Sequence, residues 1–494
     1  MLSGSRVALV NARDGVVLRP PPPSPHVVDV AAAIRDALRF PLSGSPLEAL
    51  VTRGGTATLL VQAPELPLPG AELDPRREAL AAAIDELERL GVPTTRQTIL
   101  VAGGLSRRAG QRELETLLSP SFARRFHGRV EVHDVESPDL VDLGETERTR
   151  LRVNPVLLET DLVLCVTAAE TVLYGGPGAL LGACGPEALR AGTANSLLET
   201  AAAPGWQLGV AVERLLAARV PVIGASLVLN PTRLAGRFRG YPHDDDALRQ
   251  LARSPLRRFS LLPSSVRRRL LQDLARELSA VAAFAGPPSV AHAEALLRGI
   301  AHRAVPLERP LDAIVVGMPW KHHHSPRERL NPITVAAVAL GLALRLWREA
   351  FPVADGGTAI VLHRFSRHFA HGTQDPYRGL FHSLRDGRTA DDLAAGERAA
   401  GEDARALESY RAGRACHPLL PYVDWESCRP SLDRLGAVLI AGCRDHQAAR
   451  TLGFVPTHGV SGALEMAHGR AGGQARIGFL LGPPYFPLEV GSAT

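Results

Sequence analysis

The stretch from Thr160 to Gly178 constrains the fold more than any other part of the chain. It reads TDLVLCVTAAETVLYGGPG, an apolar run of strand length that leads into a glycine-rich turn. An open α/β sheet usually binds its ligand at such a strand end. Since backbone N–H groups of glycines can surround an anion, Gly175, Gly176 and Gly178 are candidate ligand-binding residues. No lysine follows the glycines, so the turn does not indicate a nucleotide-binding loop.

The rest of the chain alternates strands with helices. Apolar runs of strand length fall at residues 57–61, 98–102, 129–132, 220–229, 312–317, 358–362, 437–441 and 475–481. Between the first two lies a helical pattern, Leu73–Leu90, which begins with the cap and proline of Asp74-Pro75. This alternation is typical of α/β domains with parallel sheets, and 494 residues are too many for one core.

We therefore expect two Rossmann-like α/β domains around a cleft. The first spans residues 1–285 and is completed by a returning strand near 475–485, and the second spans residues 286–470. The segment Ala285-Gly286-Pro287-Pro288 is the expected linker between them.

Composition excludes several classes of protein. The chain has 56 basic and 51 acidic residues, an excess too small to indicate nucleic-acid binding. Its longest apolar run, Ile333–Leu344, is too short to span a bilayer and predicts a buried helix through residue 347. Five cysteines without paired spacing, and no signal-peptide pattern, favour reduced thiols in a cytoplasm. Lys321 is the only lysine, a bias typical of a GC-rich bacterial genome.

Several segments taken together resemble the nickel-pincer lactate racemase family. They are Ala37–Leu50, Thr98–Arg108, Glu131–Ser137, Arg152–Leu164, the glycine-rich turn, and Gly436–Ala467. The resemblance implies the two-domain lactate racemase fold. It also implies a pincer cofactor tethered to a lysine thioamide, nickel held with a histidine, and further histidines that move the substrate α-proton.

When the family's reactive residues are aligned one by one with this sequence, other residue types stand at their positions. The family's first-loop aspartate and arginine fall on Gln62 and Glu65, and its next-loop histidine falls on Ser106. The nickel-binding histidine falls on Ala168, the tethering lysine on Gly178 and a later histidine on Ser196. Serine does not ionise near neutral pH, and an acid at position 65 repels a carboxylate substrate. Only His133-Asp134, Asn154 and Gly176 persist from the family pattern.

Two polar loops of the second domain offer other chemistry. Lys321, Arg364 and Arg367 follow strands and are candidate ligands for a carboxylate or phosphate. In the same loops, His322, His324, His368 and His371 are candidate ligands for a divalent metal. The alternative is a pair of exposed histidine- and arginine-rich loops without a ligand.

Two functions remain open from the sequence. One is a divergent lactate racemase-like protein, without the pincer cofactor and without racemase activity, that binds a small anionic ligand in the cleft. The other is an active 2-hydroxy acid racemase, or a related metal-dependent enzyme, that uses the histidine- and arginine-rich loops. Neither reading calls for nucleic acid or a membrane as a partner.

Overall fold

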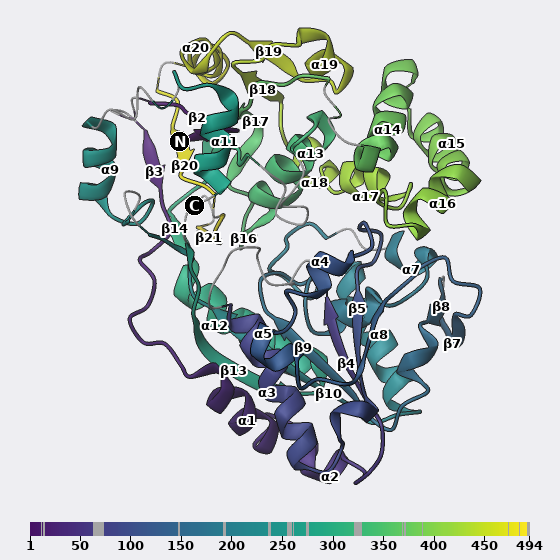
Figure 1. Ribbon diagram of the computed structural model, residues 1–494. Coiled ribbons are helices and arrows are strands. Elements are labelled where there is room, and N and C mark those ends of the chain that lie inside the picture. Colours follow the sequence, from purple (N-terminus) through teal and green to yellow (C-terminus); the bar gives the residue numbers. More distant parts are fainter. Residues whose placement is uncertain are drawn as a thin grey trace.

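The computed structural model describes residues 1–10, 12, 15–62, 74–146, 149–190, 194–235, 239–253, 259, 261–272, 276–320, 329–367, 369, 372–387, 389–472, 474–483 and 485–491. Two α/β lobes, each built on a six-stranded sheet, lie one above the other (Figure 1). The expected fold class, two Rossmann-like α/β domains, is confirmed.

The first sheet has the strand order β13-β10-β9-β4-β5-β6 and forms the lower lobe (Figure 1). Its strands are β4 (Ala57–Gln62), β5 (Gln97–Ala102), β6 (Arg129–Val132), β9 (Val163–Ala168), β10 (Val222–Leu229) and β13 (Ala280–Gly286). All neighbours are parallel except β13, which is antiparallel to β10. Every residue of β4 and β9 is buried, as expected for central parallel strands covered on both faces.

Helices cover both faces of this sheet. Those that pack directly on it are α1 (Val30–Arg39), α3 (Pro75–Arg89), α6 (Pro177–Leu181), α8 (Pro204–Ala217) and α12 (Pro288–Arg303). On one face, α1 and α3 share a core with β4, β5 and β9, and on the other face α6 and α8 do so. Shorter elements complete the lobe: α2 (Leu47–Leu50), α4 (Gln111–Leu114), α5 (Pro120–Ala123), α7 (Pro186–Arg190) and the hairpin β7 (Val141–Thr146) and β8 (Thr149–Val153). As predicted, the Asp74 side chain caps α3, accepting from the N–H of Arg76 at 3.0 Å.

The expected linker at residues 285–288 is instead part of the first lobe. β13 ends at Gly286, and α12 begins at Pro288 and packs on β10. A Cβ on Gly224 of β10 would lie 2.8 Å from Pro288 Cα, so the helix start and the strand touch at backbone level. The first lobe therefore continues to Arg303, since the Gly-Pro-Pro sequence marks a tight strand-to-helix turn.

The second sheet forms the upper lobe, with the order β19-β18-β17-β15-β20-β3. Its strands are β3 (Val16–Leu18), β15 (Leu311–Gly317), β17 (Val353–Leu362), β18 (Ala437–Ala441), β19 (Val455–Thr457) and β20 (Ile477–Leu480), all parallel to their neighbours. The strand expected to return to the first sheet near 475–485 is β20, and that expectation is wrong. β20 pairs with β15 and β3, and the amino-terminal strand β3 also belongs to this lobe rather than to the first.

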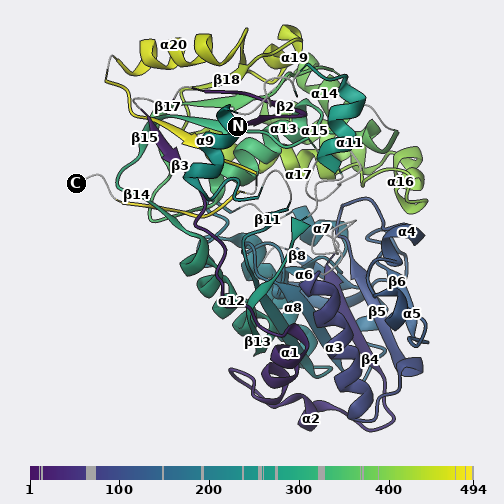
Figure 2. The same ribbon diagram turned by 60° about the vertical axis from the view of Figure 1, so that its left-hand side comes forward.

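The helices of the upper lobe flank its sheet and extend sideways from it (Figure 2). They are α13 (Pro332–Ala336), α14 (Asp375–Asp386), α15 (Ala390–Gly401), α16 (Ala404–Arg411), α17 (Leu420–Glu426), α18 (Arg429–Leu432), α19 (His446–Thr451) and α20 (Val460–Ala471). Short strands complete it: β1 (Leu2–Ser3), β2 (Arg6–Val7), β14 (Val305–Leu307), β16 (Trp347–Arg348) and β21 (Leu488–Val490).

The buried helix expected over residues 333–347 is interrupted. α13 gives way to a π-helical turn over Ala337–Leu342 and then to a 3-10 turn over Ala343–Arg345. A Cβ on Gly341 would collide with Ser427, so the turn packs closely on the neighbouring helix end. Such π turns inside helices often occur at functional sites.

Between β10 and β13 the chain leaves the first lobe. This segment holds β11 (Arg233–Leu234), α9 (Asp245–Arg253), α11 (Ser264–Gln272) and β12 (Arg276–Glu277). Both views place α11 against the upper lobe (Figures 1 and 2). The Arg267 side chain of α11 is 6% exposed and donates to the Ser5 carbonyl at 3.1 Å, which fixes α11 to the amino-terminal hairpin β1–β2.

Candidate functional site

The candidate site lies where the strand order of the first sheet changes direction. From β4 the chain proceeds to β5 and β6 on one side, and β9 and β10 lie on the other side. Ligands of open α/β sheets bind at the carboxyl ends of strands at this point. Gln62 ends β4, and the glycine loop Tyr174–Gly178 follows β9, so both lie at the expected edge.

Hydrogen bonds within the protein hold the glycine loop. The Gly175 N–H donates to Gln62 Oε1 at 2.6 Å, and the Gly176 N–H donates to Thr167 Oγ1 at 3.0 Å. The Gly178 N–H donates to the Gly175 carbonyl at 2.9 Å. Gln62 and Thr167 are buried, 5% and 4% exposed. The three N–H groups predicted to bind an anion are thus engaged inside the chain.

The loop also leaves no room for side chains. A Cβ on Gly178 would lie 2.5 Å from the carbonyl oxygen of Leu173 and 2.9 Å from its carbonyl carbon. A Cβ on Gly176 would lie 2.8 Å from the Pro288 carbonyl and would also collide with His292. Gly176 has φ +51°, which favours glycine. A lysine at position 178 therefore requires a backbone shift of the loop.

Ser196 forms part of the contact between the lobes. Its side chain is 1% exposed, and its hydroxyl donates to the Trp347 carbonyl while accepting from the Leu198 N–H at 3.1 Å. The Leu197 N–H donates to the Arg345 carbonyl at 2.8 Å. Ser196, which the sequence analysis aligned with a histidine, thus ties the segment before α8 to the upper lobe.

Arg345 is a buried cation that the sequence analysis did not single out. It is 1% exposed, and its guanidinium donates to the carbonyls of Asn195 at 3.4 Å, Gly341 at 3.3 Å and Ser427 at 3.1 Å, and to that of Ala194. Burial lowers its pKa to about 10. The available signal was a single charge inside an otherwise apolar run, since such a charge needs polar partners.

A carboxyl group faces the glycine loop from α17. Asp424 Oδ2 accepts from the Tyr377 hydroxyl at 2.5 Å, and burial raises the pKa of Asp424 to about 6. Burial, with the charge of Asp424, raises the pKa of Tyr174 in the glycine loop well above its usual value. Tyr174, Asp424 and Arg345 thus bring polar groups of both lobes to this edge, and the sequence pattern did not predict their approach.

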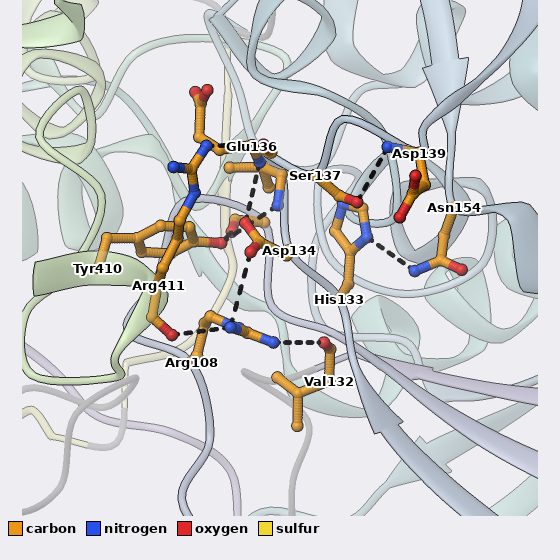
Figure 3. Close-up of polar contacts among 12 residues, drawn as sticks. Arg108, Val132, His133, Asp134, Glu136, Ser137, Asp139, Asn154, Tyr410 and Arg411 are labelled. Carbon is orange, nitrogen blue, oxygen red and sulfur yellow. Dashed lines mark hydrogen bonds and ion pairs between the residues drawn. The ribbon is translucent and has the colours of Figure 1, made fainter. Parts of the chain in front are cut away.

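His133 is a buried framework residue. It is 1% exposed, its Nε2 lies 2.9 Å from the Cys184 carbonyl and its Nδ1 lies 3.2 Å from Asn154 Nδ2 (Figure 3). These partners fit a neutral ring that donates from Nε2 and accepts at Nδ1. Burial lowers the pKa of His133 to about 4, so the ring is neutral at pH 7. Asp134 instead pairs with Arg108 at 3.6 Å.

The loops after β5 and β6 are covered by the upper lobe. The Tyr410 ring of α16 points toward the loop that carries Asp134, and Arg108 reaches both Asp134 and the Arg411 carbonyl (Figure 3). The Leu105 carbonyl accepts from the His417 N–H at 2.9 Å. Ser106 therefore lies in a loop that is fixed between the two lobes, and its side chain is partly exposed.

The candidate ligands of the second domain are only partly described. Arg364 follows β17 and is partly exposed, and Arg367 Nε donates to Asp445 Oδ2 at 2.8 Å. Six candidates lie outside the described residues: Glu65, Lys321, His322, His324, His368 and His371. Ala168 is the buried last residue of β9. Within the described ranges, no three His, Cys, Asp or Glu side chains are grouped to hold a metal ion.

Comparison with known proteins supports the fold. Residues 4–178 match the family model described as the lactate racemase N-terminal domain. The whole chain is similar to the structure of the lactate racemase apoprotein from Thermoanaerobacterium thermosaccharolyticum, with a TM-score of 0.60 and 14% identity over 98% of this chain and 96% of that chain. A Thermotoga maritima protein solved by a structural genomics consortium has a TM-score of 0.48 and 11% identity over 93% and 98% of the two chains.

No curated protein matches this chain. The expected resemblance to lactate racemases and the expected fold are both confirmed. In addition, no helix among the described residues has the length and apolar character needed to cross a membrane.

Proposed function

We propose that this chain, which has the lactate racemase fold and a lactate racemase N-terminal domain, does not carry the nickel pincer and does not racemise lactate. In place of that chemistry it binds a small anionic ligand through arginines of its upper lobe. Its proposed location is the cytoplasm of a bacterium.

The lack of space for a side chain at Gly178 supports the proposal that the chain does not carry the pincer. The pincer is tethered through a lysine, and the residue aligned with that lysine has the Leu173 carbonyl 2.5 Å from where its Cβ would be. Lys321 is the only lysine of the chain and follows β15 of the other lobe. The amine and the imidazoles that the pincer requires are therefore missing where the fold would present them, and the residues present do not fit this group.

Structural hydrogen bonds at the family's reactive positions support the same conclusion. Gln62 holds the Gly175 N–H, and Ser196 links the lobes through the Trp347 carbonyl. An acid/base group must reach a substrate proton to transfer it. A buried amide and a buried hydroxyl that already bond to the backbone do not offer this chemistry.

The charge on the upper lobe supports the proposal that the chain binds a small anion. Arg364 projects from the carboxyl end of β17, an edge at which parallel sheets bind ligands. No carboxylate among the described residues forms an ion pair with it. A small anion would supply the missing negative charge.

A chiral assay of lactate tests the proposal. The purified chain, made in a host that synthesises the pincer, is incubated with L-lactate and then with D-lactate, and the enantiomers are separated by chromatography. A lactate racemase made in the same host is the positive control. We expect no interconversion above the blank without protein. Interconversion by this chain, with the control active, contradicts the proposal.

A further inference from the structure

We propose that Arg6, Arg267, Arg364 and Arg444 form a binding site for a phosphate-bearing small molecule at the carboxyl edge of the second sheet. This inference rests on the proposed function, because it names the site and the chemical class of the anionic ligand.

Strand register places two of these arginines side by side. β17 and β18 are parallel neighbours, and Leu362 at the end of β17 pairs with Ala441 at the end of β18. Arg364 lies two residues beyond the first and Arg444 three residues beyond the second. Since both loops leave the same edge of the sheet, the two guanidinium groups emerge close together.

The amino-terminal hairpin brings a third arginine to this edge. Ser3 of β1 forms a bridge with Met318, the residue after β15, and the Gly4 N–H donates to the Met318 carbonyl at 3.0 Å. A Cβ on Gly4 would lie 3.6 Å from the His363 ring, so the hairpin also covers the end of β17. Arg6 begins the second strand of this hairpin, and its charge acts on Arg364.

Helix α11 supplies the fourth arginine. Arg267 is almost fully buried, and its Nε donates to the Ser5 carbonyl, one residue before Arg6. The neighbouring Arg268 lies over the ring of Trp320, 4.9 Å from the ring centroid, and Arg329 lies 5.1 Å from the same centroid. Positive side chains from α11 and from the segment after β15 therefore gather around Trp320.

The charges of Arg6, Arg364 and Arg444 are not neutralised within the described residues. No carboxylate there forms an ion pair with Arg6, Arg364 or Arg444, and Asp445, the nearest acid in sequence, pairs with Arg367. Burial, together with the charges of Arg6, Arg444 and Arg267, lowers the pKa of Arg364 to about 10. Folding brings these cations together despite their mutual repulsion.

Four buried polar atoms at the same corner have no hydrogen-bond partner within the described part of the chain. They are Arg6 Nε, Arg268 Nε, Trp320 Nε1 and His363 Nδ1. Buried polar groups in folded proteins are nearly always bonded, so an orphaned donor beside a cluster of cations indicates a ligand that accepts hydrogen bonds. Guanidinium groups bind phosphate through paired N–H···O contacts, and several converging arginines suit a dianion with three free oxygens better than a single carboxylate.

Calorimetric titration of the full chain at low ionic strength tests this site. The probes are inorganic phosphate, succinate as a dicarboxylate and acetate as a monocarboxylate. The variants are Arg364→Gln and Arg6→Gln, and the matched control is Arg385→Gln, which removes one exposed arginine of the same lobe that pairs with Asp386.

We expect phosphate to bind the parent chain more tightly than succinate or acetate. Arg364→Gln and Arg6→Gln should each weaken phosphate binding by at least about tenfold, and Arg385→Gln by less than about twofold, because only the first two remove charge-assisted hydrogen bonds to the phosphate. In buffer without phosphate, Arg364→Gln should also raise the melting temperature, since it relieves repulsion. A folding defect would lower that temperature instead.

Three results overturn the inference. They are no phosphate binding by the parent chain, tighter binding of succinate than of phosphate, or unchanged phosphate binding in both arginine variants. If both variants bind phosphate as tightly as the parent chain does, phosphate binds elsewhere on the protein. This result refutes the site at these arginines but not the proposal that the chain binds an anion. Lactate interconversion in the assay above overturns the proposed function independently of these titrations.

Discussion

Replacing Gly178 by alanine tests whether the glycine loop is as closed as the structure indicates. The added Cβ would lie 2.5 Å from the oxygen and 2.9 Å from the carbon of the Leu173 carbonyl. Both are backbone atoms of a loop fixed by the Gln62 and Thr167 hydrogen bonds, so no side chain can move away to relieve the contact.

The expected effect is a moderate loss of stability. Overpacking of a close-packed region costs about 1–3 kcal/mol. Alanine regains up to about 1 kcal/mol through its higher helix propensity, because residue 178 lies in α6. Contacts of 2.5 and 2.9 Å with backbone atoms place the cost in the upper half of that range, about 2–3 kcal/mol. The net loss is then about 1–2 kcal/mol, which lowers the melting temperature of a lobe of this size by roughly 2–8 °C.

Gly182→Ala at the end of α6 is the matched control. There the Cβ would meet its nearest neighbours at 3.3, 3.4 and 3.5 Å, and the residue has ordinary helical angles. We expect its melting temperature, measured by differential scanning calorimetry, to equal or exceed that of the parent chain. If Gly178→Ala melts at the same temperature as the parent chain, the loop can accommodate a side chain, and the steric argument against a lysine there is refuted.

Two further predictions concern buried polar groups. Three buried histidines, His133, His292 and His363, have pKa values lowered to about 4, so their contribution to stability is complete above about pH 6.5 and is lost as the pH falls toward 4. Asp424, whose pKa is raised to about 6, has the opposite effect on stability, because unfolding releases its proton below pH 6. Between pH 6.5 and 5, unfolding should therefore take up a net of roughly one to two protons, and the protein should become less stable as the pH falls. A urea midpoint that stays constant over this range would contradict the buried neutral histidines. Ser196→Ala should cost about 1–3 kcal/mol, since it leaves a buried carbonyl and a buried N–H without their partner. Urea denaturation measures this loss, and Ser137→Ala, whose hydroxyl only accepts from a nearby N–H on the surface, should cost much less.

Local patterns in the sequence predicted the individual elements well. The runs at 57–61 and 98–102 form β4 and β5, and Asp74-Pro75 begins α3 as expected. These features depend on residues a few positions apart, so periodicity and capping preferences are sufficient to identify them.

Membership of the sheets could not be predicted in this way. β20 and β3 join the upper lobe because their partners are β15 and one another, which are far apart in the chain. A short apolar strand carries no signal of which sheet it enters. The same limit applies to α12, since its contact with Gly224 of β10 depends on tertiary packing.

In the candidate site, too, local features could be predicted from the sequence and contacts between distant segments could not. The sequence analysis aligned Gln62, Gly178 and Ser196 with the family's reactive groups, and this alignment stays a prediction. The sequence did not predict that Thr167 bonds to the glycine loop and the Trp347 carbonyl to Ser196, because those contacts depend on the folded loops and on the contact between the lobes. Arg345 was visible as a charge within an apolar run, but its carbonyl partners come from three separate segments.

The intact mass of the chain, produced in a host that makes the pincer cofactor, tests the central claim most directly. The claim is that the fold is retained while the tether for the metal cofactor is gone. We predict the mass of the unmodified polypeptide, while a lactate racemase from the same host shows the added mass of its cofactor. A covalent adduct on this chain, mapped by peptide sequencing to Lys321 or to any other residue, would contradict the claim.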